Sequence, residues 1–259
     1  MHPVCFSIFS FTVYNYFVFW MVSFCIFFFY TGYRAKNLFG FEPAEINRII
    51  FWICIAAVIS AYLGNISDKF FLKKYDEMFS GGMSSSPGIL FGGITGAILL
   101  YRRKIPVDIF AEAATLPFAL FISTGRIGCF LQGCCYGILV KGYPHPWWAV
   151  YFPFDAPYRV PRYPTQLMES GVALILFSVC LLIEKFSSRA SLREGRRGFI
   201  FPLFLSGYAL YRLFFDKLRA KDILSKYYCY LALIFAVIWI AVSFYKGRYK
   251  KSGAYSCEK

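Results

Sequence analysis

Apolar residues in this chain are gathered into long blocks, and polar or charged stretches separate the blocks. The blocks lack the strict alternation of apolar and polar residues that marks the strands of a transmembrane barrel. Because only helices and closed barrels satisfy all their backbone hydrogen bonds inside lipid, the blocks predict membrane-spanning helices. We expect about seven of them, over residues 4–30, 46–63, 87–101, 109–136, 166–183, 199–215 and 227–245.

Some of these predicted spans are irregular. The first has no basic leader and no small-residue cleavage site, so it is interpreted as a retained span rather than a removed signal peptide. The third is short and glycine-rich, and is marginal against the roughly 20 apolar residues that a span needs. The fourth is expected to be broken at Pro117 and at several glycines. The predicted fold class is all-α and polytopic, with a single membrane domain over residues 1–259 and a basic tail from about residue 246.

The distribution of basic residues predicts the orientation of the spans. The connections after the first, third and fifth spans, together with the tail, hold more Lys and Arg than the other connections. Since basic loops are retained on the cytoplasmic side, we expect the N-terminus outside and the C-terminus in the cytoplasm. The longest outer connection, over residues 138–164, is rich in Pro, Trp and Tyr, and it is expected to lie on the outer membrane surface.

The composition agrees with a membrane protein and narrows the choice of partners. Hydrophobic residues make up 58% of the chain and charged residues 16%, with a mean hydropathy of +0.53. A soluble domain carries about 25% charged residues. A net charge of +14 would suggest nucleic acid in a soluble protein. Here the basic residues lie in loops and the tail and no nucleic-acid-binding motif is visible, so the membrane is the expected partner and nucleic acid is not.

The segment from Gly125 to Gly137 places a charged residue, Arg126, inside an apolar span. An arginine there is costly unless it is paired or hydrated. Two interpretations stay open. In one, the glycines form a tight packing seam and Arg126 reaches toward the membrane interface. In the other, they leave room for a cavity in which the guanidinium binds a phosphate through paired hydrogen bonds.

Residues 163–170 carry a second candidate group. Pro164 fixes a turn, Thr165 can cap the following helix, and Glu169 lies about one turn into that helix. In one interpretation, Glu169 is an ordinary acid that the helix dipole favours. In the other, its carboxylate faces Arg126 or Arg212, or serves as a general base.

Tyr208, Arg212 and Asp216 are spaced four residues apart and therefore share one helical face. Three polar groups on one face of a span are expected to face the protein interior or water. The alternative is that Arg212 and Asp216 pair where the helix leaves the membrane.

Gly88, Gly92 and Gly96 form a line of small residues along the third span. Such lines usually mark close packing of two helices, and this is the interpretation that we favour. A groove for a lipid chain or headgroup is the alternative.

Taken in order, these four segments resemble the bacterial phosphatidylglycerol–prolipoprotein diacylglyceryl transferase family. That family has a Gly-Gly pair in its third span, followed by a Gly-Arg-x-Gly-Asn-Phe-x-Asn-x-Glu-x-x-Gly signature. It then has a His-Pro-x-Gln-Leu-Tyr-Glu segment. Its last motif is a Tyr-x-x-x-Arg pattern before an acidic-Phe-Phe-Arg-like run. The counterparts here are Gly92-Gly93 and residues 125–137, 163–169 and 208–219. The resemblance covers about residues 42–219, and its strength lies in the shared order of all four motifs.

The resemblance implies a reaction and a location. The family transfers a diacylglyceryl group from phosphatidylglycerol to the thiol of a lipobox cysteine in a lipoprotein precursor, and glycerol-1-phosphate leaves. The reaction takes place in the bacterial cytoplasmic (inner) membrane. No metal and no cofactor are implied.

The resemblance also implies residue roles, with Arg126, Arg212 and Glu169 as the catalytic set. The two arginines would bind the phosphodiester and stabilise the departing phosphate. Tyr208 would donate to the phosphate, and Glu169 would orient an arginine. The substrate-binding set is Arg126, Tyr208 and Arg212 with the glycines Gly92, Gly93, Gly125, Gly128 and Gly137.

Several positions depart from the family pattern. Phe91 stands in place of the family His before the Gly-Gly pair, and Tyr163 in place of the His before the proline. Cys129 replaces the signature Asn, and Cys134 replaces its Glu. The arginines are kept while acid–base groups are lost. Two functions therefore stay open, the transferase reaction or a phospholipid-binding or thiol-reactive membrane relative without it.

Cys129, Cys134 and Cys135 fall in the same segment. They are either small apolar packing residues or a thiol site that accepts a lipid group or takes part in redox chemistry. A disulfide between the adjacent Cys134 and Cys135 is disfavoured because its ring is strained. A metal site is disfavoured because no Cys-x-x-Cys pair or nearby His completes a tetrahedral set.

Overall fold

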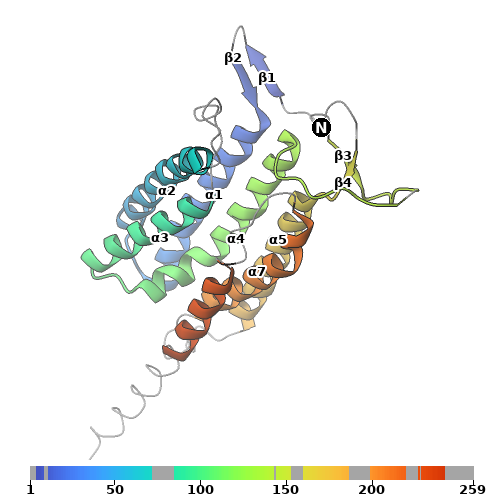
Figure 1. Cartoon of the computed structure of the whole chain (residues 1–259). Helices are drawn as coiled ribbons and strands as arrows, with labels where there is room; N and C mark the ends of the chain where they lie inside the picture. The colour runs from blue at the N-terminus through green and yellow to red at the C-terminus, as the bar shows by residue number, and fades with distance from the viewer. Residues whose placement is uncertain are drawn as a thin grey trace, which may run out of the picture. The chain divides into compact units, whose positions relative to one another are not determined.

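The computed structural model describes residues 4–8, 11–71, 85–142, 144–152, 160–186, 199–219, 227 and 229–242. This part of the chain is helical, with two short antiparallel strand pairs (Figure 1). The helices are α1 (Asn15–Phe39), α2 (Pro43–Phe71), α3 (Ser85–Arg102), α4 (Val107–Gln132), α5 (Thr165–Phe186), α7 (Ile200–Phe215) and the short 3-10 helix η2 (Asp216–Leu218). The strands are β1 (Val4–Ile8), β2 (Phe11–Tyr14), β3 (Val150–Tyr151) and β4 (Pro161–Arg162). A last apolar helix covers Cys229–Val242.

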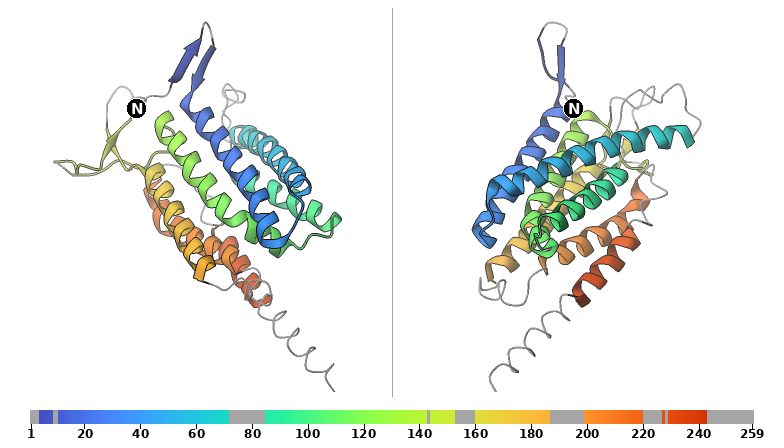
Figure 2. Two further views of the ribbon diagram at one scale, coloured as in Figure 1. Left: turned by 180° about the vertical axis from the view of Figure 1, so that it is seen from behind. Right: turned by 90° about the vertical axis from the view of Figure 1, so that its left-hand side faces the viewer.

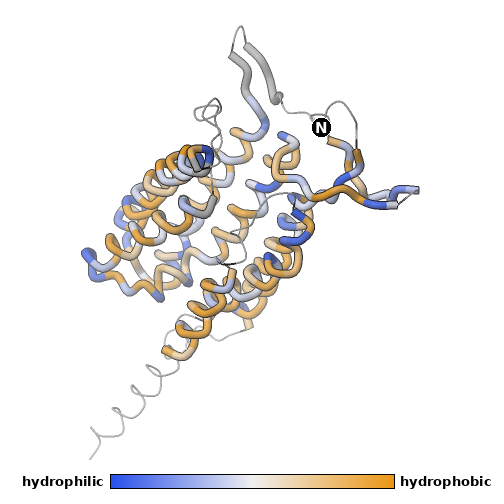
Figure 3. Tube along the Cα trace, viewed as in Figure 1, coloured by the Kyte–Doolittle hydropathy of each residue, from blue (hydrophilic) through white to orange (hydrophobic). Residues whose placement is uncertain are grey.

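The helices are hydrophobic along most of their length (Figure 3). Among the described residues, α1, α4, α5 and the Pro43–Ser67 part of α2 are each long and apolar enough to cross a membrane. The Pro87–Arg102 part of α3 and the helix Cys229–Val242 are apolar but shorter. Large apolar side chains on the long helices are exposed, for example Phe29 at 67% and Ile175 at 63%. Such surfaces suit a lipid environment, and the fold fits an α-helical membrane protein.

The prediction of a helix from residue 4 is wrong. Residues 4–8 and 11–14 form the antiparallel strand pair β1–β2, in which Ile8 pairs with Phe11 and Ser7 pairs with Thr12. The aromatic and β-branched residues of this stretch favour strands, and the hydrophobicity that predicted a span does not distinguish the two structures. The helix α1 starts at Asn15 and continues to Phe39, nine residues beyond the predicted end.

Arg34 follows the predicted end of the first span at residue 30, but it lies within α1. Its side chain is buried, and its guanidinium donates to the carbonyl oxygens of Ala113 (3.0 Å) and Glu112 (3.2 Å). These bonds compensate for the loss of water around the buried charge. Arg34 thus has a structural role.

The prediction that Pro117 breaks the fourth span is also wrong, because α4 runs without interruption from Val107 to Gln132. A proline inside a membrane helix is tolerated where neighbouring segments satisfy the freed backbone group. The helix ends at Gly133, whose φ of 73° suits glycine. The helices α3, α5 and α7 match the predicted spans to within three residues at each end, whereas α2 extends eight residues further.

The chain divides into two compact units, residues 28–113 and residues 1–27 with 114–259. In the first unit, α2 and α3 lie side by side and run antiparallel (Figure 2). A Cβ atom added to Gly92 would lie 3.1 Å from the Cβ of Ala57, and one added to Gly96 would lie 3.0 Å from a methyl carbon of Ile53. The glycine line therefore packs against α2, which confirms the favoured interpretation.

The second unit is built around α4, α5 and α7. The rings of Phe118 and Phe204 join α4 to α7, and the hydroxyls of Ser123 and Ser170 join α4 to α5 at 2.9 Å. The helices α5 and α7 also lie side by side (Figure 1). The prediction of a single membrane domain stays a prediction, and the predicted basic tail from residue 246 lies outside the described residues.

Candidate active site

Glu169 lies at the centre of a cluster of charged side chains in the second unit. It is one turn into α5, and its side chain is 1% exposed. One carboxylate oxygen, Oε1, is 2.9 Å from Nη2 of Arg126 and accepts a short hydrogen bond from the hydroxyl of Tyr208. The other, Oε2, is 3.6 Å from Nη1 of Arg212 and 3.7 Å from Nη2 of Arg219. One buried carboxylate thus contacts three guanidinium groups.

Separate elements supply these side chains. Arg126 comes from the last part of α4, whereas Tyr208 and Arg212 lie one turn apart on α7. Asp216, in the following turn, is 3.5 Å from Nη2 of Arg212. The predicted common face of Tyr208, Arg212 and Asp216 is therefore confirmed. Both interpretations of this face apply, because Arg212 pairs with Asp216 and also reaches the interior carboxylate.

Arginines predominate among the described charged side chains of the cluster. Arg126, Arg212 and Arg219 surround Glu169, and Asp216 pairs with Arg212. These five side chains are between 1% and 17% exposed. A low-dielectric surrounding strengthens the electrostatic attraction between such charges.

The contacts of Glu169 also decide between its predicted roles. Its carboxylate faces both Arg126 and Arg212, as the second interpretation predicted. Both oxygens are already occupied by guanidinium groups, and one also accepts from Tyr208. These contacts suit a group that orients arginines better than one that takes a proton from a substrate.

Gly137 lies where three segments of the site meet. Its N–H donates to the carbonyl of Tyr163 (3.0 Å), and the next N–H, of Ile138, donates to the carbonyl of Leu218 (2.8 Å). A Cβ atom at Gly137 would lie 2.6 Å from the oxygen of Leu218 and 2.9 Å from a side-chain carbon of Thr165. The loop after α4 thereby fixes the start of α5, which carries Glu169, beside the segment that carries Arg219.

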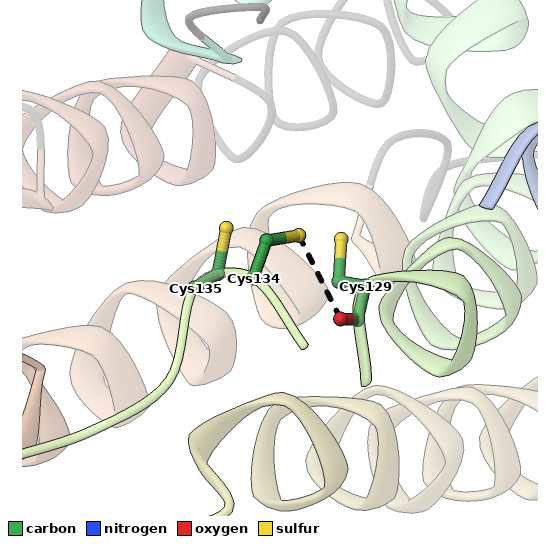
Figure 4. Close-up of side chains that lie close together, drawn as sticks. All are labelled: Cys129, Cys134 and Cys135. Atoms are coloured by element: carbon green, nitrogen blue, oxygen red, sulfur yellow. Dashed lines mark hydrogen bonds between the residues drawn. The ribbon is translucent and has the colours of Figure 1, made fainter. Parts of the chain in front are cut away.

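Three cysteines form a second cluster at the end of α4 (Figure 4). Cys129 lies in the last turns of α4, and Cys134 and Cys135 lie in the loop that follows. Their sulfur atoms are all within 4.8 Å of one another. The thiol of Cys134 donates to the carbonyl of Cys129 at 3.6 Å. Cys129 is buried and Cys135 is exposed, so the cluster extends from the interior to the surface.

Two buried side chains at the start of α5 hold the cysteine loop. The amide of Gln166 donates to the carbonyl of Cys134 (2.6 Å), and the hydroxyl of Thr165 donates to the carbonyl of Cys135 (3.0 Å). These two bonds fix the backbone of the cysteine loop against the start of α5.

The predicted glycines occupy different surroundings. In the second unit, Gly128 packs closely on α1, since an added Cβ atom would lie 2.8 Å from Phe19. Gly125 has only ordinary contacts with α1 side chains. In the first unit, Gly93 has open space beside it, and the neighbouring Phe91 is 52% exposed. The predicted binding of substrate by these glycines stays a prediction.

Arg219, Gln166 and Thr165 complete the site and were not predicted as site residues. Arg219 ends the Tyr208–Arg219 motif, so its position in that motif was an available signal. Gln166 and Thr165 contribute through hydrogen bonds to the carbonyls of Cys134 and Cys135, which lie about 30 positions earlier in the chain. Sequence spacing carries no information on contacts of this kind.

The fold and the site together fit an α-helical membrane protein with a buried cluster of arginines around one carboxylate. The chain belongs to the prolipoprotein diacylglyceryl transferase family, whose family model matches residues 3–245. This is a family of transferases.

Several relatives carry the name phosphatidylglycerol–prolipoprotein diacylglyceryl transferase. The protein of Rhizobium leguminosarum bv. trifolii is 32% identical over 194 residues, which are 69% of this chain and 62% of the relative. That of Azospirillum brasilense is 29% identical over 85% of this chain and 82% of the relative. That of Rhodospirillum centenum is 31% identical over 70% of this chain and 65% of the relative. The chain thus spans less than two thirds of the length of two of these three relatives.

Proposed function

We propose that this chain transfers a diacylglyceryl group from phosphatidylglycerol to the thiol of a lipobox cysteine in a lipoprotein precursor. The observation that carries the proposal is the buried cluster around Glu169, in which one carboxylate contacts three guanidinium groups. Phosphatidylglycerol carries one negative charge, on its phosphodiester. Membership of the transferase family and the names of the relatives support the same substrates.

The cluster suits the chemistry of this transfer. The bond that breaks joins the glyceryl carbon to a phosphate oxygen, so negative charge grows on the departing glycerol phosphate. Guanidinium groups that are already in place stabilise that charge without first having to reorganise. In this proposal Arg126 and Arg212 bind the phosphate, Tyr208 donates to it, and Glu169 holds the arginines in position.

The same proposal includes a membrane arrangement. We place the protein in the bacterial cytoplasmic (inner) membrane as a multi-pass protein of about seven spans, with the N-terminus outside and the C-terminus in the cytoplasm. The long apolar helices and the distribution of basic residues support this arrangement. The lipid donor would enter from the bilayer, and the acceptor cysteine would come from a secreted precursor.

The test is transfer by the purified protein in vesicles that contain phosphatidylglycerol. A lipobox peptide should gain the mass of one diacylglyceryl group, and a peptide with serine in place of the cysteine should not. Arg126→Ala and Arg212→Ala should each lower the rate by about 100-fold or more. The control is Arg103→Ala, because Arg103 is also paired with a glutamate but its side chain is 50% exposed.

The alternative function is a phospholipid-binding or thiol-reactive membrane protein without this transfer. The observation that favours it is the replacement of the family His, Asn and Glu by Phe91, Cys129 and Cys134. It predicts that phosphatidylglycerol co-purifies with the protein while the peptide keeps its mass. That result, under conditions in which a relative transfers the group, would reject the transferase proposal.

A further inference from the structure

The proposed transfer needs a thiolate, because the thiolate and not the thiol is the attacking form. Compared with the family pattern, this chain lacks groups that could assist that ionisation. Two of the departing residues, Cys129 and Cys134, belong to the cysteine cluster at the end of α4. The signature Glu is thus replaced by a thiol within that cluster.

The distances in the cluster suit a metal ion. The three sulfur atoms lie within 4.8 Å of one another. A zinc ion with Zn–S bonds of about 2.3 Å in tetrahedral geometry places its sulfur ligands about 3.8 Å apart. The observed limit of 4.8 Å exceeds that spacing by only about 1 Å. Spacing in the sequence disfavoured a metal, because the segment has no Cys-x-x-Cys pair and no nearby histidine.

The backbone conformation at Cys135 bears on how two adjacent cysteines can bind the same ion. Cys135 has a φ of 59°, in the left-handed region that non-glycine residues rarely adopt. Such a conformation persists where the surroundings enforce it, and it often marks a functional site. Here Gln166 and Thr165, which are 1% and 3% exposed, hold the carbonyls of Cys134 and Cys135. The loop is therefore built to keep both thiols beside Cys129.

We propose that Cys129, Cys134 and Cys135 bind a zinc ion whose fourth position takes the acceptor cysteine thiol. Catalytic zinc sites use three protein ligands and leave one position open, whereas structural sites use four. The exposed Cys135 leaves a side from which an incoming thiol can reach the ion. This inference rests on the proposed transferase function, and it supplies the thiol activation that the lost acid–base groups no longer provide.

The proposed transfer conserves atoms and electrons. Zinc coordinates the acceptor thiol, and its proton passes to water, because a coordinating thiol is deprotonated. The zinc-bound sulfur then forms a bond to the glyceryl carbon. The bond from that carbon to the phosphate oxygen breaks, and its electron pair leaves with glycerol phosphate. The product is a neutral thioether, which binds zinc more weakly than a thiolate and dissociates.

The position of Arg126 connects the two clusters. Arg126 precedes Cys129 by three residues on α4, so the two side chains share a helical face. The same guanidinium is 2.9 Å from Glu169 in the arginine cluster. Its positive charge also offsets part of the negative charge that three or four thiolates place around a zinc ion. The C-terminal end of α4 thereby holds both the phosphate that leaves and the thiol that is activated.

The direct test is metal content and coordination in the reduced, full-length protein in detergent. We expect about one zinc per chain after zinc is supplied, and Co²⁺ in its place should give the visible absorption of a tetrahedral thiolate site. Cys129→Ser, Cys134→Ser and Cys135→Ser should each weaken zinc binding by at least about 100-fold, since loss of even an outer-shell partner costs about 10- to 100-fold. The matched control is Cys25→Ser, because Cys25 is an exposed cysteine on α1 outside the cluster.

A second measurement tests the open position without any transfer. In the absence of phosphatidylglycerol, a lipobox peptide should shift the Co²⁺ spectrum, and the same peptide with serine for cysteine should not. Zinc binding at full stoichiometry without transfer from any phospholipid would reject the transferase function and leave the metal site standing. Transfer that survives all three cysteine substitutions, a protein that binds no zinc when reduced, or a spectrum that does not respond to the peptide would overturn this inference.

Discussion

At the scale of single residues, the most unusual feature of this protein is a carboxylate buried among apolar helices. Glu169 alone would be costly there, and so would each of its arginine partners. Together they compensate for one another, because each charge finds an opposite charge within 4 Å. In the proposed function, the arginines that Glu169 holds in place bind the phosphate of the substrate. Glu169 would thus both stabilise the folded protein and fix the positions of the arginines.

The residue-scale prediction concerns Glu169→Gln. The amide keeps the shape and can still accept from Tyr208, but the three arginines lose the negative charge that holds them. We expect the free energy of unfolding to fall by about 3–5 kcal/mol and the transfer rate to fall by about 100-fold, since misplaced groups lose that much. Thermal unfolding in detergent and the initial rate of peptide lipidation measure the two effects.

The control for this substitution is Glu45→Gln. Glu45 is also paired with an arginine, at 3.8 Å, but its side chain is 39% exposed. Exposed pairs contribute about 0–1 kcal/mol, so this variant should behave like the unmodified protein. Equal effects of the two substitutions would mean that the buried cluster has no special role.

At the scale of elements, the loop after α4 determines how α5 and the end of α7 meet. Backbone hydrogen bonds run from this loop to Tyr163, just before α5, and to Leu218, just after α7. These bonds bring Glu169 and Arg219 together, although 50 residues separate them in the chain. The loop is therefore as important to the site as the helices that carry the charged groups.

We predict that Gly137→Ala disrupts this junction. The added methyl group would lie 2.6 Å from the carbonyl oxygen of Leu218, so the loop or the η2 segment must move. Overpacking of this kind costs about 1–3 kcal/mol of stability, and the transfer rate should fall with the displaced arginine. Gly171→Ala on α5 is the control, because no atom lies within 4 Å of its added methyl group. Similar unfolding curves for the two variants would contradict the prediction.

A second element-scale prediction separates packing from substrate binding on α3. Gly92→Leu should lower the unfolding temperature, because Gly92 packs against Ala57 on α2, whereas Gly93→Leu should not, because the space beside Gly93 is open. If Gly93 also binds lipid, as the family resemblance implies, Gly93→Leu should lose transfer while keeping its stability. Normal transfer by a stable Gly93→Leu variant would remove Gly93 from the substrate-binding set.

At the scale of the whole molecule, the long apolar helices fit a membrane, and the distribution of basic residues predicts an orientation in it. The proposed arrangement puts the C-terminus in the cytoplasm. Green fluorescent protein attached after Lys259 should therefore fluoresce. Alkaline phosphatase attached at the same position should stay inactive, because its disulfides form only outside the cytoplasm. Active phosphatase in that fusion would reverse the proposed orientation.

Much of this molecule follows from the sequence. Long apolar blocks predicted helices because a backbone in lipid must satisfy its own hydrogen bonds, and α3, α5 and α7 match the predicted spans to within three residues at each end. Spacing placed Tyr208 and Arg212 on one face, since a helix repeats every 3.6 residues. Hydrophobicity alone did not separate the strand pair β1–β2 from helix, and proline alone did not end α4.

The sequence by itself thus determined the membrane class and the charged residues that need partners, because these depend on composition and on local periodicity. It also indicated the family, through the resemblance of four motifs in the same order. Only the tertiary structure decided which partners they have. The contacts from Glu169 to Arg126 and Arg219, and the meeting of Cys129 with Cys135, depend on how separate helices and one loop pack. Such contacts are set by packing across the fold, and packing is not encoded in the spacing of any one segment.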